Sequence, residues 1–127
     1  MVDEVTWPVE SIPDSDAVFM RAHQMHFREG QLQPGVFKQQ GEGMSVDWEK
    51  YSTPLETRNR AAKLHQNAVI ALNVGGVRET FGLQVQHTPD YPSNRAHSDV
   101  TGFPRNTPER TEVRIKLLRI SSVLLPL

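Results

Sequence analysis

The 127-residue sequence contains no cysteine, which excludes disulfide bonds, thiolate nucleophiles and cysteine-ligated zinc. Small secreted domains are often held together by disulfides, so their absence favours the cytoplasm. The sequence also lacks any apolar run near the roughly 20 residues of a membrane-spanning helix. Its acidic beginning, MVDEVTWPVE, does not have the pattern of a secretory signal. We therefore expect a soluble, cytoplasmic protein with no membrane segment.

A strong net charge is also missing, because 14 basic and 15 acidic side chains leave a formal charge of -1. No overall field therefore selects for nucleic acid or an anionic membrane. The charge is nevertheless uneven, since residues 1–16 hold five acidic side chains and no basic one. The length and the 37% hydrophobic content fit one globular domain.

Local patterns predict an α+β fold: a single domain over residues 17–127, preceded by an N-terminal arm over residues 1–16. Alternating or continuous apolar residues predict a mainly antiparallel sheet of about five strands. These strands are expected at 17–23, 44–48, 68–74, 83–87 and 96–101. The 68–74 strand is nearly all apolar and β-branched, which indicates a central strand buried on both faces.

One helix has a clear start signal in the sequence. Thr53-Pro54-Leu55-Glu56 is a capping box with proline at the first helical position, so we expect a helix from about Pro54 to about Leu64, packed on the sheet. Gly41-x-Gly43 and Gly75-Gly76 lack the context of a nucleotide-binding loop and are interpreted as turns.

The C-terminal part is ambiguous. Residues 111–117 alternate and favour a turn followed by a strand, although a helix through Val113, Leu117, Ile120 and Leu124 also fits. The apolar tail, residues 123–127, is expected to dock on its own domain or to meet a partner chain. The predicted core consists of Val18, Met20, Val69, Ile70, Leu72, Val74, Leu83, Val85, Val100, Val113, Ile115 and Leu117.

The candidate site lies where two predicted strands flank a polar loop. His87 ends the first of these strands, and His97 and Asp99 lie on the second. Histidine exchanges protons near neutral pH, and arginine binds phosphate oxygens. We therefore predict metal-free acid/base catalysis on a nucleotide, RNA or another phosphorylated substrate. His87 and His97 would be base and acid, Asp99 would orient an imidazole, and Arg21 and His23 would bind the substrate.

Two other functions remain open. His87, His97, Asp99 and His23 could form a zinc or iron site, but no recognised ligand spacing supports one, so no metal or other cofactor is assigned. The second alternative is a non-catalytic interaction protein or a subunit of a bacterial-type complex. Its apolar tail and the glycine-rich 24–43 segment would contact a protein partner or a second copy of the chain.

A limited resemblance concerns the order of four residues. Arg21, then Ser45, then Trp48 or Tyr51, and finally Glu112 resemble the layout of ADP-ribosyltransferase folds. The resemblance is one of order and covers scattered positions. It implies nucleotide chemistry on a split sheet.

Overall fold

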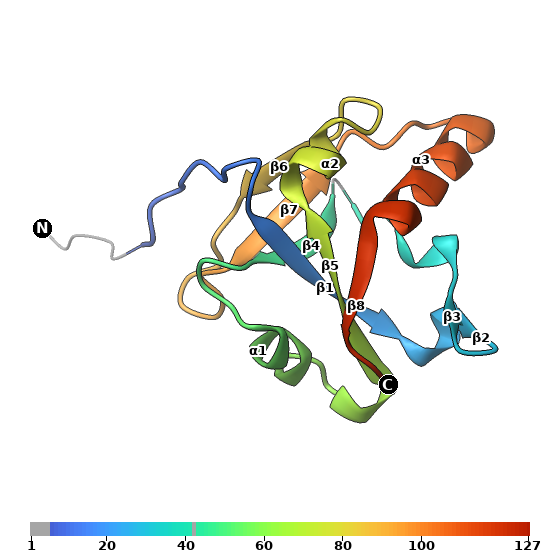
Figure 1. Ribbon diagram of the computed structural model, residues 1–127. Helices are drawn as coiled ribbons and strands as arrows, with labels where there is room; N and C mark the ends of the chain where they lie inside the picture. Colours follow the sequence, from blue (N-terminus) through green and yellow to red (C-terminus); the bar gives the residue numbers. More distant parts are fainter. Residues whose placement is uncertain (1–5, 42) are drawn as a thin grey trace, which may run out of the picture.

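The computed structural model describes residues 6–41 and 43–127 and contains a six-stranded antiparallel sheet (Figure 1). The strand order is β6-β7-β4-β1-β5-β8. The strands are β1 (Ala17–His23), β4 (Met44–Trp48), β5 (Asn67–Asn73), β6 (Gln84–His87), β7 (His97–Thr101) and β8 (Ser121–Leu125). Two short strands, β2 (Phe27–Arg28) and β3 (Gln31–Leu32), form a separate hairpin. The predicted α+β class with a mainly antiparallel sheet is confirmed, with six strands in place of about five.

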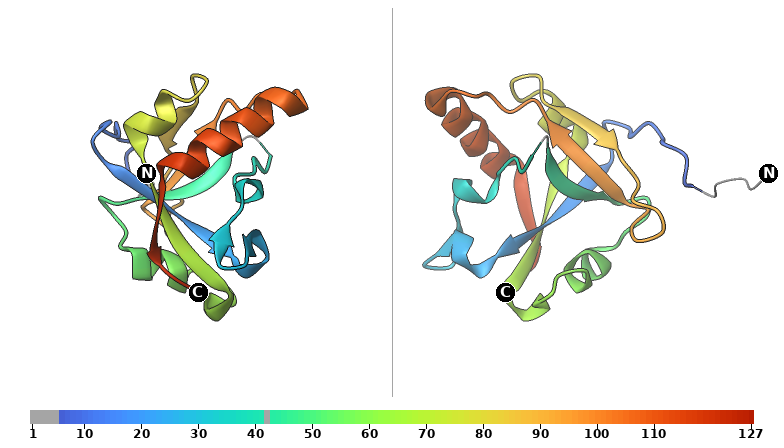
Figure 2. Two further views of the ribbon diagram at one scale, coloured as in Figure 1. Left: turned by 45° about the vertical axis from the view of Figure 1, so that its right-hand side comes forward. Right: turned by 180° about the vertical axis from the view of Figure 1, so that it is seen from behind.

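Helices cover both faces of the sheet. The helix α3 (Thr107–Ile120) and the short helix α2 (Val74–Arg78) pack on one face, where the main hydrophobic core lies (Figure 2). The 3-10 turn Pro34–Val36 packs beside α3. The helix α1 (Pro54–Asn59) lies on the opposite face, against β1 and β5. Further 3-10 turns span Gln24–His26 and Leu64–Gln66.

The predicted capping box is present at the start of α1. The Thr53 hydroxyl accepts a hydrogen bond from the Glu56 N–H, and the Glu56 carboxylate accepts one from the Thr53 N–H, each at 3.1 Å. The helix ends at Asn59, earlier than the expected Leu64, because the chain must turn back to start β5 opposite the end of β1.

Thr53→Ala is expected to destabilise the domain by about 1 kcal/mol, because it removes the hydroxyl that satisfies a helix N–H. The melting temperature should fall by several degrees, as measured by circular dichroism. Thr53→Ser, which keeps the hydroxyl, is the matched control, and its melting temperature should stay close to that of the wild type. An equal fall in melting temperature in both variants would contradict the capping role of Thr53.

The predicted strand at 111–117 is wrong, because these residues lie within α3. Asn106 caps the helix by accepting from the Glu109 N–H at 2.9 Å, and proline occupies the first turn. Val113 and Leu117 are four residues apart and share the buried face. Ile115 was predicted to be in the core, but it is 38% exposed on the helix surface.

The predicted 68–74 strand is an interior strand buried on both faces, as expected. Its counterpart β5 lies between β1 and β8, and the neighbouring residues Val69 and Ile70, which point to opposite faces, are both fully buried. The apolar tail pairs with β5 as the edge strand β8, so it docks on its own domain. Val123, Leu124 and Leu127 nevertheless remain substantially exposed.

Gly75 and Gly76 lie in α2 and not in the predicted turn. Asn73 caps this helix by accepting a hydrogen bond from the Gly76 N–H at 2.9 Å. A Cβ at Gly75 would come within 3.1 Å of the Asp14 carbonyl oxygen. Close packing against the backbone of Asp14 therefore favours glycine at this position.

Residues 6–16 of the predicted arm lie against the domain, and residues 1–5 lie outside the described residues. Ile12 is buried, and the Arg78 guanidinium donates to its carbonyl oxygen and to the Asp14 carboxylate, both at 2.7 Å. Arg78 also donates to the Val85 carbonyl oxygen, so it joins the arm to β6. In the part of the chain that the structure describes, no helix combines the length and apolar character needed to cross a bilayer.

Candidate functional site: a cationic cavity between β1 and β4

The sheet is split between β1 and β4. These two strands pair only at Val18–Trp48 and Phe19–Asp47, whereas β1 pairs with β5 along its whole length. Beyond those positions β1 and β4 diverge (Figure 2). A cavity of about 410 Å³ opens at the divergence. If the register continued, Arg21 would lie opposite Ser45, and both residues line this cavity.

Basic groups dominate the charged lining of the cavity. They come from β1, the 24–43 segment, the end of α1 and β7, and among the described residues of the lining the single acidic one is Asp47. The basic and titratable residues are Arg21, His23, His26, Lys38, Arg60 and His97. The remaining lining combines neutral polar residues with five apolar side chains: Phe19, Met20, Val36, Met44 and Val46. The lining of the cavity therefore combines cationic and apolar groups.

Both arginines are held in place by hydrogen bonds. Arg21 Nη1 donates to the Thr57 carbonyl oxygen at 3.1 Å. Arg60 Nη1 donates to Asp47 Oδ2 and to Ser52 Oγ, each at 2.8 Å. A guanidinium has five N–H donors, so these contacts fix its position and leave donors for a ligand.

Asp47 is the centre of a buried polar network under the cavity. Its Oδ2 atom accepts hydrogen bonds from Arg60 and from Thr57 Oγ1, and its Oδ1 atom accepts from Asn94 Nδ2 at 2.8 Å. Thr57 is in turn within 2.8 Å of Ser52 Oγ. Because both carboxylate oxygens already accept hydrogen bonds, Asp47 holds Arg60 in a defined orientation.

His97 is oriented by Thr88. The Nδ1 atom lies 2.9 Å from the Thr88 carbonyl oxygen and 3.0 Å from the Thr88 hydroxyl. The same hydroxyl donates to Asp99 Oδ2 at 2.9 Å. On the other side of the ring, Nε2 lies 3.3 Å from Ser45 Oγ. Asp99 therefore acts on His97 through Thr88, although it does not line the cavity itself.

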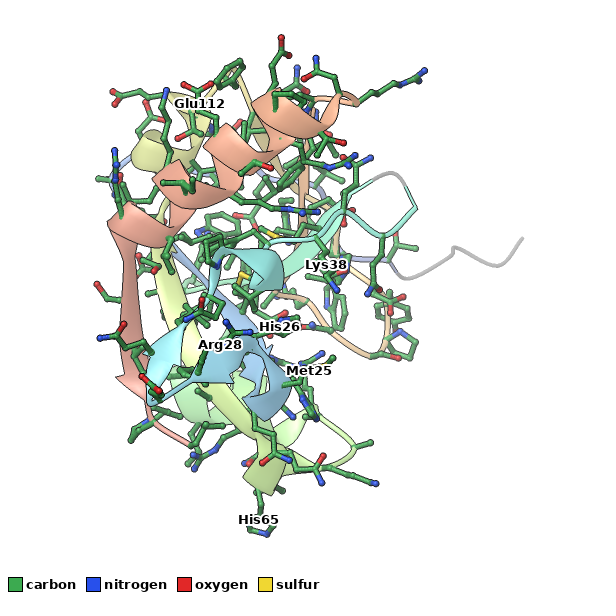
Figure 3. All side chains as sticks on the ribbon, turned by 90° about the vertical axis from the view of Figure 1, so that its right-hand side faces the viewer. Met25, His26, Arg28, Lys38, His65 and Glu112 are labelled. Atoms are coloured by element: carbon green, nitrogen blue, oxygen red, sulfur yellow. The ribbon has the colours of Figure 1, made fainter. Side chains whose placement is uncertain are left out.

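Two further histidines border the cavity near β1. His23 accepts a hydrogen bond from the Met25 N–H through Nδ1, and its Nε2 lies 3.1 Å from Gln66 Oε1. Burial, with smaller effects from the Lys38 and His23 charges, lowers the pKa of His26 below its ordinary value. Figure 3 shows His26 and Lys38 on the same side of the molecule. An excess of positive charge here would be relieved by a bound anion.

No family model, curated protein or solved structure matches this chain. Of the four positions that resemble ADP-ribosyltransferase folds, Arg21 and Ser45 line the cavity. Trp48 is buried in the core. Glu112 is on α3, far from His26 and Lys38 (Figure 3).

His87 lies away from the cavity. It pairs with Ser98, and because side chains alternate along a strand, its ring and that of His97 project to opposite faces. His87 is 1% exposed, accepts a hydrogen bond from the Glu10 N–H, and lies against the Trp48 and Tyr51 rings. The two imidazoles predicted as an acid/base pair are not brought together. Within residues 6–41 and 43–127, no group of three His, Asp or Glu side chains is arranged to hold a metal ion.

Sequence reasoning placed Arg21, His23 and His97 at the site, and these three line the cavity. It missed the cavity residues His26, Lys38, Asn94 and Arg60. The length of the 24–43 segment was the available signal for the first two, because long connections in compact domains are often functional. No local sequence pattern predicts that Arg60 lies at the cavity, since its position depends on a tertiary contact with Asp47.

Proposed function

We propose that this chain binds a phosphate group of a nucleotide, RNA end or other phosphorylated molecule in the β1–β4 cavity, and acts on it by metal-free acid/base chemistry at His97. The observation that carries the proposal is the pair of arginines, Arg21 and Arg60, each fixed by its own hydrogen bonds at one cavity. Preset guanidinium groups bind tetrahedral oxyanions well, because little side-chain entropy is lost on binding.

The other properties of the cavity support the same ligand class. Its volume, about 410 Å³, suits a small molecule and not a bare ion. Lys38 adds a third cationic side chain, while Phe19 and Met20 offer an apolar surface for the rest of the ligand. A ligand with a phosphate at one end and a base or sugar at the other uses both parts.

His97 provides the acid/base group. Since Thr88 accepts from Nδ1, the neutral ring presents an unprotonated Nε2 atom toward Ser45. That nitrogen can accept a proton from a reacting hydroxyl or water and return it to a leaving group. The predicted partnership with His87 has no role in this form of the mechanism.

Binding of inorganic phosphate or AMP is expected to shift the imidazole NMR signals of His26 and His97 together. His65, exposed at the far end of the molecule (Figure 3), and the buried His87 should not respond. Arg21→Ala and Arg60→Ala should each weaken binding about 10-fold or more, because each removes a charge-assisted hydrogen bond. The matched control is Arg28→Ala, which removes an exposed arginine next to the cavity but not in its lining.

The same titration tests the charge of the cavity. A bound anion favours the imidazolium form, so phosphate should raise the pKa of His26 from its lowered value. By linkage, a proton is taken up on binding, so the contribution of His26 to affinity grows as the pH falls through its phosphate-bound pKa and is complete below its free-state pKa. An equal response in Arg28→Ala and Arg21→Ala, or no histidine response at all, would reject the proposal. A chain that acts only as an interaction protein through β8 would give no response.

A further inference from the structure

We propose that Ser45 is a nucleophile and that His97 is the base that activates it, so that the cavity passes the phosphoryl group of its ligand through a Ser45-bound intermediate. This inference rests on the proposed function, because it names the reaction at the phosphate. It is carried by the hydrogen bonds of four side chains on β4, β7 and the start of the 88–95 loop.

The hydrogen bonds determine which nitrogen of His97 carries the proton. The Thr88 carbonyl oxygen can only accept, so the Nδ1 atom 2.9 Å away must be the donor. The Thr88 hydroxyl gives its one hydrogen to Asp99, so it too accepts from Nδ1. The neutral ring therefore has its lone pair on Nε2, which lies 3.3 Å from Ser45 Oγ. Ser45 can donate to this lone pair, which is the arrangement required of a serine and its base.

The sheet register explains why these groups meet. Ser45 pairs with Asp99 and Asp47 pairs with His97 across β4 and β7, so Ser45 and His97 are diagonal neighbours on one face. Gly43 keeps space for the Asp99 side chain, because a Cβ there would lie 3.1 Å from Asp99 Cβ. Ser45 is exposed to the cavity, whereas Thr88 and Asp99 are half-buried behind the imidazole. Thr88 and Asp99 are thus positioning residues.

The reaction conserves atoms and charge in two steps. Ser45 Oγ forms a bond to the ligand phosphorus, and its proton passes to His97 Nε2. The bond from phosphorus to the leaving oxygen breaks, and that oxygen takes the electron pair and the proton from His97. Water then attacks the phosphoserine phosphorus and gives a proton to His97 Nε2. The bond from phosphorus to Ser45 Oγ breaks, and Oγ takes the proton from His97, which releases phosphate and restores the Ser45 hydroxyl. Arg21 and Arg60 are placed to stabilise the non-bridging oxygens.

The test uses the full chain and diisopropyl fluorophosphate, which is neutral and therefore does not need the arginines. In the labelling reaction Ser45 Oγ bonds to phosphorus, the P–F bond breaks, fluoride leaves and His97 takes the proton. Mass spectrometry of the intact protein and of its peptides should find one adduct, on Ser45. Ser45→Ala should abolish it, and Ser122→Ala, which removes an exposed serine on β8, should leave it unchanged.

The variants at His97 and Thr88 separate activation from mere exposure. His97→Gly should slow labelling about 100-fold or more, and added imidazole should restore part of the rate. Thr88→Val should slow it, whereas Thr88→Ser, which keeps the hydroxyl, should retain it. Phosphate binding is measured separately, by the histidine NMR titration of the wild type, so failure of the proposed function (no phosphate response) and failure of this inference (no Ser45 adduct) are distinguishable. Absence of an adduct on Ser45, or equal labelling in His97→Gly without imidazole, would overturn the inference.

Discussion

Leu117→Ala is expected to destabilise the domain by about 2–5 kcal/mol, because it leaves a cavity in a fully buried part of the core. Leu117 lies on the face of α3 that covers the sheet, together with Val113. Alanine is a good helix former, so the loss reflects packing and not helix propensity. Chemical denaturation with urea measures the change in unfolding free energy directly.

The matched control is Ile115→Ala on the same helix. Ile115 is 38% exposed, so its truncation should change the unfolding free energy by no more than about 1 kcal/mol. A strand over 111–117 would instead place residues 115 and 117 on the same buried face and make the two losses similar. Similar losses in both variants would therefore contradict the helix.

The sequence predicted the elements whose pattern has one structural meaning. β1 and β4 have the predicted bounds, and the capping box begins α1 where expected. The 111–117 segment failed because Val113 and Leu117 fit both a strand face and a helix face. The helix was decided by Asn106 as cap and by proline in the first turn, since these residues satisfy the helix start and favour its backbone.

The candidate site was predictable only in part, because a site depends on register and on tertiary contacts. Arg21 and His23 share a face of β1, and the alternation alone reveals this. Whether His87 and His97 share a face depends on how β6 pairs with β7, and a shift of one residue would reverse the answer. No local pattern reports that register. Lys38 reaches the cavity only through the fold of the 24–43 segment.

Asp47→Asn is expected to destabilise the domain by about 1–3 kcal/mol, because it disrupts a network of buried donors. Three donors converge on the two carboxylate oxygens, from Arg60, Thr57 and Asn94. An amide has only one oxygen, so its NH₂ group must face at least one of these donors. Asp14→Asn is the matched control, since it makes the same change at an exposed pair with Arg78 and should cost less than about 1 kcal/mol.

The same substitution is expected to weaken phosphate binding, although Asp47→Asn removes a negative charge from a cavity that should bind anions. A simple charge effect would strengthen binding, so weaker binding identifies Asp47 as the group that positions Arg60. The double variant Asp47→Asn/Arg60→Ala tests this by calorimetry: it should bind phosphate no more weakly than Arg60→Ala alone. If the losses of phosphate-binding free energy in the two single variants add in full in the double variant, Asp47 acts independently of Arg60. If Asp47→Asn binds more tightly than the wild type, the orientation of Arg60 does not limit binding, and the cavity attracts anions through its net charge alone.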